Sequence, residues 1–95
     1  MHLADTTTLA RNPATVSARI EETVVLLDEQ REHLELEGVG ITVWEALAAP
    51  TTVGALVRLL AEEYDADPAT VRHDVAPFLG ELVRRGVVQA DPDRV

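Results

Sequence analysis

The stretch that decides the fold is LELEGVGITVWEAL, residues 34–47. In its first half, Leu34 and Leu36 alternate with glutamates, as residues do in a strand with one buried face. In its second half, Ile41 and Trp44 recur at helical spacing, and no linker separates the two patterns. The stretch therefore predicts a strand that leads directly into a helix. The chain's only tryptophan then lies where sheet and helices share a core.

Length and composition predict one small domain. The chain has 95 residues, 46% of them apolar, which supports one core that buries about 60 to 65% of the unfolded surface. Its 17 acidic and 8 basic residues give a net charge of -9, which repels phosphate backbones and anionic lipids. We therefore expect neither a nucleic-acid nor a membrane partner.

Two kinds of sequence signal are missing. The chain has no cysteine, which excludes disulfides, thiolate metal sites and cysteine nucleophiles. It also has no signal-peptide pattern at its start and no apolar run approaching ~20 residues. We expect a cytoplasmic protein.

The first third of the chain predicts an arm followed by a sheet. Residues 1–13 are polar and show no period, which predicts a flexible N-terminal arm. The domain is expected over residues 14–90, with residues 91–95 as a C-terminal tail. The β-branched and alternating runs predict three strands, over residues 16–20, 22–27 (with the apolar run 23–27) and 32–37.

Two helices are expected after these strands. The first is predicted over residues 39–48, because the residue before Pro50 disfavours the helical region. Thr51 or Thr52 is expected to cap the second helix, whose apolar stripe reaches Tyr64.

The third helix carries both start and stop signals. It is expected to start with Asp67 as cap and Pro68 at the first helical position, and to end before Gly86. Pro77 lies inside it and predicts a kink. Residues 87–89 favour one more short strand. Three strands followed by three helices predict an α+β fold with a winged-helix-like arrangement.

The residues offer no recognisable catalytic or metal chemistry. His73 lies beside the carboxylate of Asp74, but helix neighbours point about 100° apart and form no oriented acid-base pair. No metal-binding histidine spacing, serine elbow or glycine-rich phosphate loop occurs. We expect no enzymatic activity, no cofactor and no metal.

DNA binding is the commonest use of a winged helix, so it has to be weighed. The reading element would be the third helix, whose acidic and basic residues balance: Asp67, Asp74 and Glu81 against Arg72, Arg84 and Arg85. Such a helix lacks the electropositive stripe that supplies most affinity for phosphates. A regulatory or DNA-binding module is therefore the weaker alternative.

Three motifs follow one another from Glu22 onward and cover about three quarters of the chain. The first is a strand that ends in leucine and runs through glycine into a tryptophan-bearing helix, here Leu36, Gly40, Val43, Trp44 and Leu47. The second is a threonine-capped helix with a Glu-Tyr-Asp tail, here Thr52 and residues 63–65. The third is a helix closed by glycine and a hydrophobic pair, here Asp74-Val75, Phe78-Leu79, Leu82, Gly86 and Val87-Val88.

This order and spacing resemble the PqqD-like family of RiPP precursor peptide recognition elements. These domains bind the leader peptides of ribosomally made, post-translationally modified peptides. The resemblance implies that a leader adds as an antiparallel strand along residues 32–37, in the groove beside the third helix. Freestanding domains of this length resemble the lasso peptide protein that carries the leader to its peptidase and cyclase. The alternative is a chaperone that hands the pyrroloquinoline quinone precursor to a radical enzyme.

The residues expected to bind the leader come from one strand and one helix. They are Glu32, His33, Leu34, Glu35 and Leu36 in the strand, and Val71, Arg72, Asp74, Val75, Phe78 and Leu79 in the helix. The apolar members are expected to form the groove walls, although each is also compatible with a place in the core, and for Val75 the core is favoured. Arg72 and Asp74 are expected to read leader charges. Homodimerisation through this edge is a third alternative, which the alternating glutamates disfavour because like charges would meet.

Overall fold

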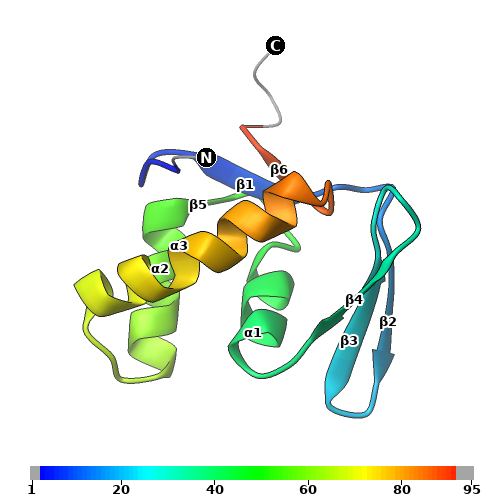
Figure 1. The fold of residues 1–95 in the computed structure, drawn as a ribbon. Helices are drawn as coiled ribbons and strands as arrows, with labels where there is room; N and C mark the ends of the chain where they lie inside the picture. The colour runs from blue at the N-terminus through cyan, green and yellow to red at the C-terminus, as the bar shows by residue number, and fades with distance from the viewer. Residues whose placement is uncertain (1–2, 92–95) are drawn as a thin grey trace.

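The structure is a computed structural model that describes residues 3–91. It has an α+β fold, as predicted, with three helices and two three-stranded antiparallel sheets in the described part of the chain (Figure 1). No helix among these residues is both long enough and apolar enough to cross a bilayer. In chain order the elements are β1 Thr8–Arg11, β2 Val16–Ile20, β3 Thr23–Leu27, β4 His33–Leu36, α1 Val39–Ala46, β5 Thr51–Thr52, α2 Val53–Glu63, α3 Pro68–Arg84 and β6 Val88–Ala90.

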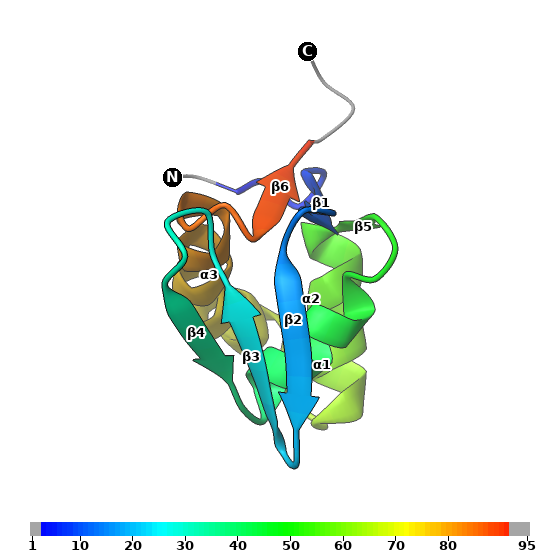
Figure 2. The ribbon, with the colours of Figure 1, turned by 90° about the vertical axis from the view of Figure 1, so that its right-hand side faces the viewer.

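The main sheet has the order β2-β3-β4, with β3 in the middle. Its register places Val24 opposite Leu36 and Leu26 opposite Leu34. Because side chains alternate along a strand, these residues share one face. That face is turned to the core, where Val24, Leu26 and Leu36 are buried. Figure 2 shows the three helices behind this sheet.

The second sheet corrects the expectation of a flexible arm over residues 1–13. It has the order β5-β1-β6, so β1 is its central strand, and Leu9 is fully buried between Thr51 and Ala90. The segment was misread because its one fully buried strand residue leaves no visible period, and its partners lie far along the chain. Residues 1–2 of the arm, and the expected tail beyond Asp91, lie outside the described residues.

The helix starts follow the predicted capping chemistry. The side chain of Thr52 accepts a hydrogen bond from the backbone N–H of Ala55 at 3.2 Å. Asp67 does the same for Thr70 at 3.1 Å, with proline at the first position of α3. The first helix ends at Ala46, two residues earlier than expected. Pro77 lies exposed within α3, and the kink expected there stays a prediction.

An arginine joins β1 to the helical core. The Arg11 guanidinium lies over the Trp44 ring, 4.4 Å from its centroid, and its Nε donates to the Trp44 carbonyl at 2.8 Å. Burial lowers the pKa of Arg11 from its ordinary value, and the charge of Glu45 opposes that shift. The contact holds β1, the central strand of the second sheet, against α1.

A buried aspartate organises the turn between β3 and β4. Asp28 is only 7% exposed, and one of its carboxylate oxygens accepts the backbone N–H groups of Gln30 and Glu32, both at 2.9 Å. Its other oxygen lies 3.4 Å from the guanidinium of Arg85, the C-terminal cap of α3. The turn is therefore fastened to the end of α3.

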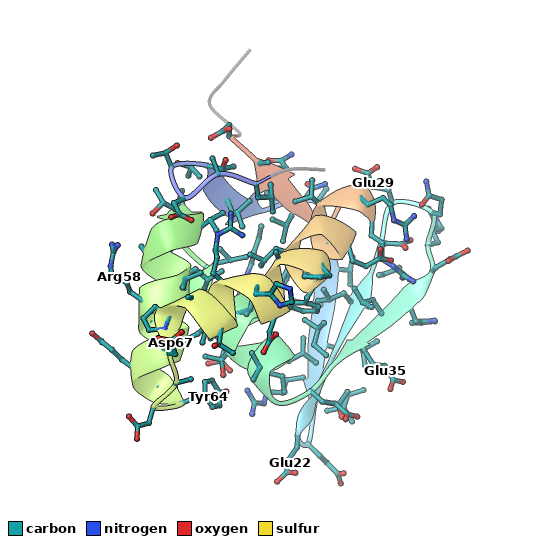
Figure 3. All side chains as sticks on the ribbon, turned by 60° about the vertical axis from the view of Figure 1, so that its left-hand side comes forward. Glu22, Glu29, Glu35, Arg58, Tyr64 and Asp67 are labelled. Carbon is teal, nitrogen blue, oxygen red and sulfur yellow. The ribbon has the colours of Figure 1, made fainter. Side chains whose placement is uncertain are left out.

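Gly86, which follows Arg85, lets the turn between β3 and β4 lie close to the end of α3. Gly86 has a φ of 80°, a conformation that favours glycine. A Cβ atom there would fall 2.3 Å from the carboxyl carbon of Glu29, which lies in the same turn beside the end of α3 (Figure 3). The lack of a side chain at this position lets the turn approach α3, which sets where β4 lies.

Replacing the buried aspartate is expected to weaken the fold. Asp28→Ala removes two turn hydrogen bonds and the contact with Arg85, so the free energy of unfolding should fall by about 1 to 3 kcal/mol in urea titrations. Asp28→Asn should cost less than half as much, because an amide oxygen still accepts the turn N–H groups. Equal stability of all three proteins would show that the turn does not depend on Asp28.

Candidate functional site

The outer edge of β4 is open. Within residues 3–91, β4 pairs only with β3. The Asp28 N–H donates to the Glu32 carbonyl at 3.0 Å, so these two residues form a hydrogen-bonded pair. Such pairs recur at every second residue of an antiparallel ladder, so Leu34 and Leu36 are the β4 residues bonded to β3. The N–H and C=O groups of His33 and Glu35 therefore point away from β3. They form a template for one further antiparallel strand.

A cleft of about 510 Å³ lies beside this edge. Four elements surround it: β4, the start of α1, the end of α2 and the first half of α3. Glu35 lies on its β4 side and Tyr64 on its α2 side (Figure 3). The cleft is lined by Glu35, Leu36, Glu37, Val39, Gly40, Leu60, Tyr64, Val71, Asp74, Val75 and Phe78.

The floor of the cleft depends on a close approach between α1 and α3. A Cβ atom on Gly40 would lie 3.4 Å from the edge of the Phe78 ring and 3.5 Å from the Leu36 Cβ. The N–H of Gly40 donates to the Glu37 carbonyl at 3.0 Å, so α1 begins in a tight turn directly after β4. A larger residue at position 40 would fill the space between the strand and α3.

The charges around the cleft all have one sign. The charged residues that line it are Glu35, Glu37 and Asp74, and no arginine among the described residues does so. Asp74 also lies 3.3 Å from the ring Nδ1 of its neighbour His73. The Tyr64 hydroxyl is hydrogen-bonded to the hydroxyl of Thr42 at 2.7 Å. The arrangement is an apolar floor with an acidic rim.

The structure brings six of the eleven predicted site residues to the cleft. They are Glu35, Leu36, Val71, Asp74, Val75 and Phe78. Leu36 and Val75 are buried and belong mainly to the core. Leu79 is fully buried, and half-buried Leu34 packs against the core outside the cleft lining. Glu32 and His33 are exposed at the start of β4. Peptide binding by these residues stays a prediction.

Arg72 lies outside the cleft. Its Nε is 2.8 Å from the Asp5 carboxylate, and its Nη2 donates to the Leu3 carbonyl. Its neighbour Val71 lines the cleft, and one step along a helix turns a side chain by about 100°, so the guanidinium faces the N-terminal segment instead. The prediction that Arg72 reads leader charges would require these bonds to break.

Sequence reasoning missed the contribution of the two helix ends. The residues concerned are Glu37, Val39 and Gly40 at the start of α1, and Leu60 and Tyr64 at the end of α2. A usable signal was the absence of a linker after β4, which forces the start of α1 against the strand. The chain's single tyrosine at a helix end was another.

An open strand edge beside an apolar cleft defines a class of small α+β domains that can receive an extended chain as an additional strand. Residues 23–88 match the family described as coenzyme PQQ synthesis protein D (PqqD). The chain belongs to this PqqD family, which confirms the resemblance drawn from its motifs.

Known relatives agree with this assignment. The bifunctional coenzyme PQQ synthesis protein C/D of Methylorubrum extorquens AM1 is 30% identical over an alignment of 82 residues, and the match covers 83% of this chain and 22% of that protein. TbiB1, solved in complex with the TbiA(beta) leader peptide, has a TM-score of 0.75 and 30% identity over 84% of this chain and 94% of that one.

A second solved structure shares the fold. It is the PqqD truncation of Methylobacterium extorquens PqqCD, described as a stand-alone RiPP recognition element. Its TM-score is 0.75 and its identity 23%, over 93% of this chain and 95% of that one.

The strand register predicts an alternating pattern of amide exchange. The amides of Leu34 and Leu36 are bonded to β3, whereas those of His33 and Glu35 face solvent. In hydrogen exchange followed by NMR, the latter pair should exchange at least about tenfold faster. Equal protection of all four amides would mean that the outer edge of β4 is covered.

Proposed function

We propose that this chain binds the leader peptide of a ribosomally synthesised precursor along β4 and presents it to a processing enzyme, without catalysing a reaction itself. The observation that carries the proposal is the open edge of β4 immediately beside an apolar cleft. The likeness to TbiB1, solved with a leader peptide, supports it.

Backbone pairing would set the direction and register of the leader. The outward N–H and C=O groups of His33 and Glu35 offer four hydrogen bonds to an antiparallel strand. Each contributes a net ~0.5 to 1.5 kcal/mol, whereas ordering each leader residue costs ~1 to 2 kcal/mol. These bonds alone do not hold a leader, so its affinity must come from side chains.

The cleft supplies that affinity. Val39 is 44% exposed, and Val71 and Phe78 are half-buried, so all three still have apolar surface to cover. Each leader side chain that becomes fully buried there would add ~1.5 to 3 kcal/mol. The already buried Leu36 and Val75 give the cleft its shape and gain little from a ligand.

The receiving enzymes are proposed to be the leader peptidase and cyclase of a lasso peptide pathway, in the cytoplasm. Membership of the PqqD family favours a second candidate, delivery of the pyrroloquinoline quinone precursor. Neighbouring genes separate the two. A peptidase and an asparagine-synthetase-like cyclase beside this gene would support the lasso pathway, and a radical enzyme would support the quinone pathway.

Removing the aromatic wall of the cleft tests the proposed site. A fluorescein-labelled peptide, enriched from a library of short random peptides on the wild-type protein, serves as the probe in anisotropy titrations. Phe78→Ala should weaken its binding at least about tenfold, because the peptide loses a buried contact. Val39→Asn, at an exposed position, should weaken binding without disturbing the fold.

Leu59→Ala is the matched control, because Leu59 is similarly exposed on α2 and does not line the cleft. It should leave the affinity unchanged. Wild-type affinity in folded Phe78→Ala and Val39→Asn proteins would contradict the site, as would a selection that enriches no peptide. Displacement of the probe by duplex DNA would favour the DNA-binding alternative instead.

A further inference from the structure

We propose that the cleft selects leader segments in which a lysine or arginine lies one or two residues from the apolar side chain that enters it. This inference rests on the proposed function and names the class of peptide that the site takes. Its basis is the sign and placement of the charges around the cleft, because the apolar floor by itself would accept any hydrophobic anchor.

Acidic residues line the cleft on its β4 side and on its α3 side. Glu35 belongs to β4, Glu37 follows that strand directly, and Asp74 comes from α3. Glu35 and Glu37 are exposed. Within the described residues, no ion pair joins either of them to an arginine. Asp74 is 71% exposed and contacts only the neighbouring His73 ring among those pairs.

The arginines on and near α3 are engaged elsewhere. Arg72 is bonded to Asp5 and to the backbone of the N-terminal segment. Arg84 and Arg85 pair with Glu81 at the far end of α3, and Arg85 also reaches the turn before β4. Figure 3 shows Arg58 projecting from the side of α2 away from the cleft. The acidic rim is therefore left for a ligand to neutralise.

The geometry of strand addition places a ligand cation next to this rim. Leu36 faces the helices, so Glu35 faces the opposite side of the sheet. In a leader paired with β4, an anchor that enters the cleft also faces the helices, and its immediate neighbours share the side of Glu35. Directly opposed residues on paired strands have Cβ atoms about 5 Å apart, and opposite charges there attract. A cation two residues from the anchor would point toward Asp74.

The expected preference is modest, because the rim is exposed to water. Each solvent-exposed charge pair changes affinity by roughly two- to fivefold, so the three carboxylates together should contribute about tenfold at low salt. That contribution should shrink as the ionic strength rises. The affinity that comes from burying the apolar anchor should be mostly retained at high ionic strength.

Parallel selections from a random peptide library test the inference. One uses the wild-type full chain and the other the Glu35→Gln/Glu37→Gln/Asp74→Asn variant. Wild type should enrich peptides with lysine or arginine one or two residues from an apolar anchor, and the variant should lose that bias. The variant should bind a wild-type-selected peptide about five- to tenfold more weakly, and the difference should disappear at high salt.

A charge-matched control removes the same number of carboxylates outside the cleft. The substitutions Glu22→Gln, Glu62→Gln and Glu63→Gln lie at exposed positions that do not line it. This control should bind the selected peptide like wild type. An equal loss in both triple variants would assign the effect to net charge and overturn the selection by the rim.

The remaining outcomes separate this inference from the proposed function. One outcome is that wild type enriches apolar anchors without nearby cations, and another is that the rim variant keeps full affinity. Either result overturns the charge selection and leaves leader binding standing. If selected peptides bind without protecting the amides of His33 and Glu35 from exchange, strand addition fails and the inference fails with it.

Discussion

The open edge of β4 depends on how the strand is held at its two ends. Before the strand, the Asp28 turn is fastened to Arg85 and lies against Gly86 at the end of α3. After it, α1 begins at once and packs through Gly40 against the ring of Phe78. The strand is thereby fixed beside α3 while its outer N–H and C=O groups stay free. A ligand meets a preformed edge, so only the ligand has to be ordered.

The main sheet has two edges, and they differ in what lies beside them. β2, the opposite edge, is exposed along its whole length, and its one charged residue, Arg19, pairs with Glu45 at 3.0 Å. β4 carries alternating glutamates, which disfavour pairing with a second copy of the chain. The apolar cleft of about 510 Å³ adjoins β4. The proposed recognition of a leader would therefore use both the strand and the apolar surface beside it.

Local rules explain why much of the fold was predictable. The strand over 16–20 was predicted to the residue, and the strand expected within 22–27 covers 23–27, because strand propensity and turn residues act within a few positions. The caps Thr52 and Asp67 followed in the same way. β1 was missed because a short polar segment becomes a strand only through partners at the far end of the chain. About half of the cleft residues were predicted, for a similar reason. Periodicity gives the face of α3 that lines the cleft, whereas tertiary packing brings the ends of α1 and α2 to it.

Intermolecular NOEs between a selected peptide and the protein give the most direct test of strand addition. Because His33 and Glu35 would form the bonded pairs with the peptide, the close Hα–Hα contacts should come from Leu34 and Leu36. Such contacts to consecutive alternate residues of the peptide would establish an added antiparallel strand on β4. Contacts confined to β2 or to the outer face of α3, with none from β4, would contradict it.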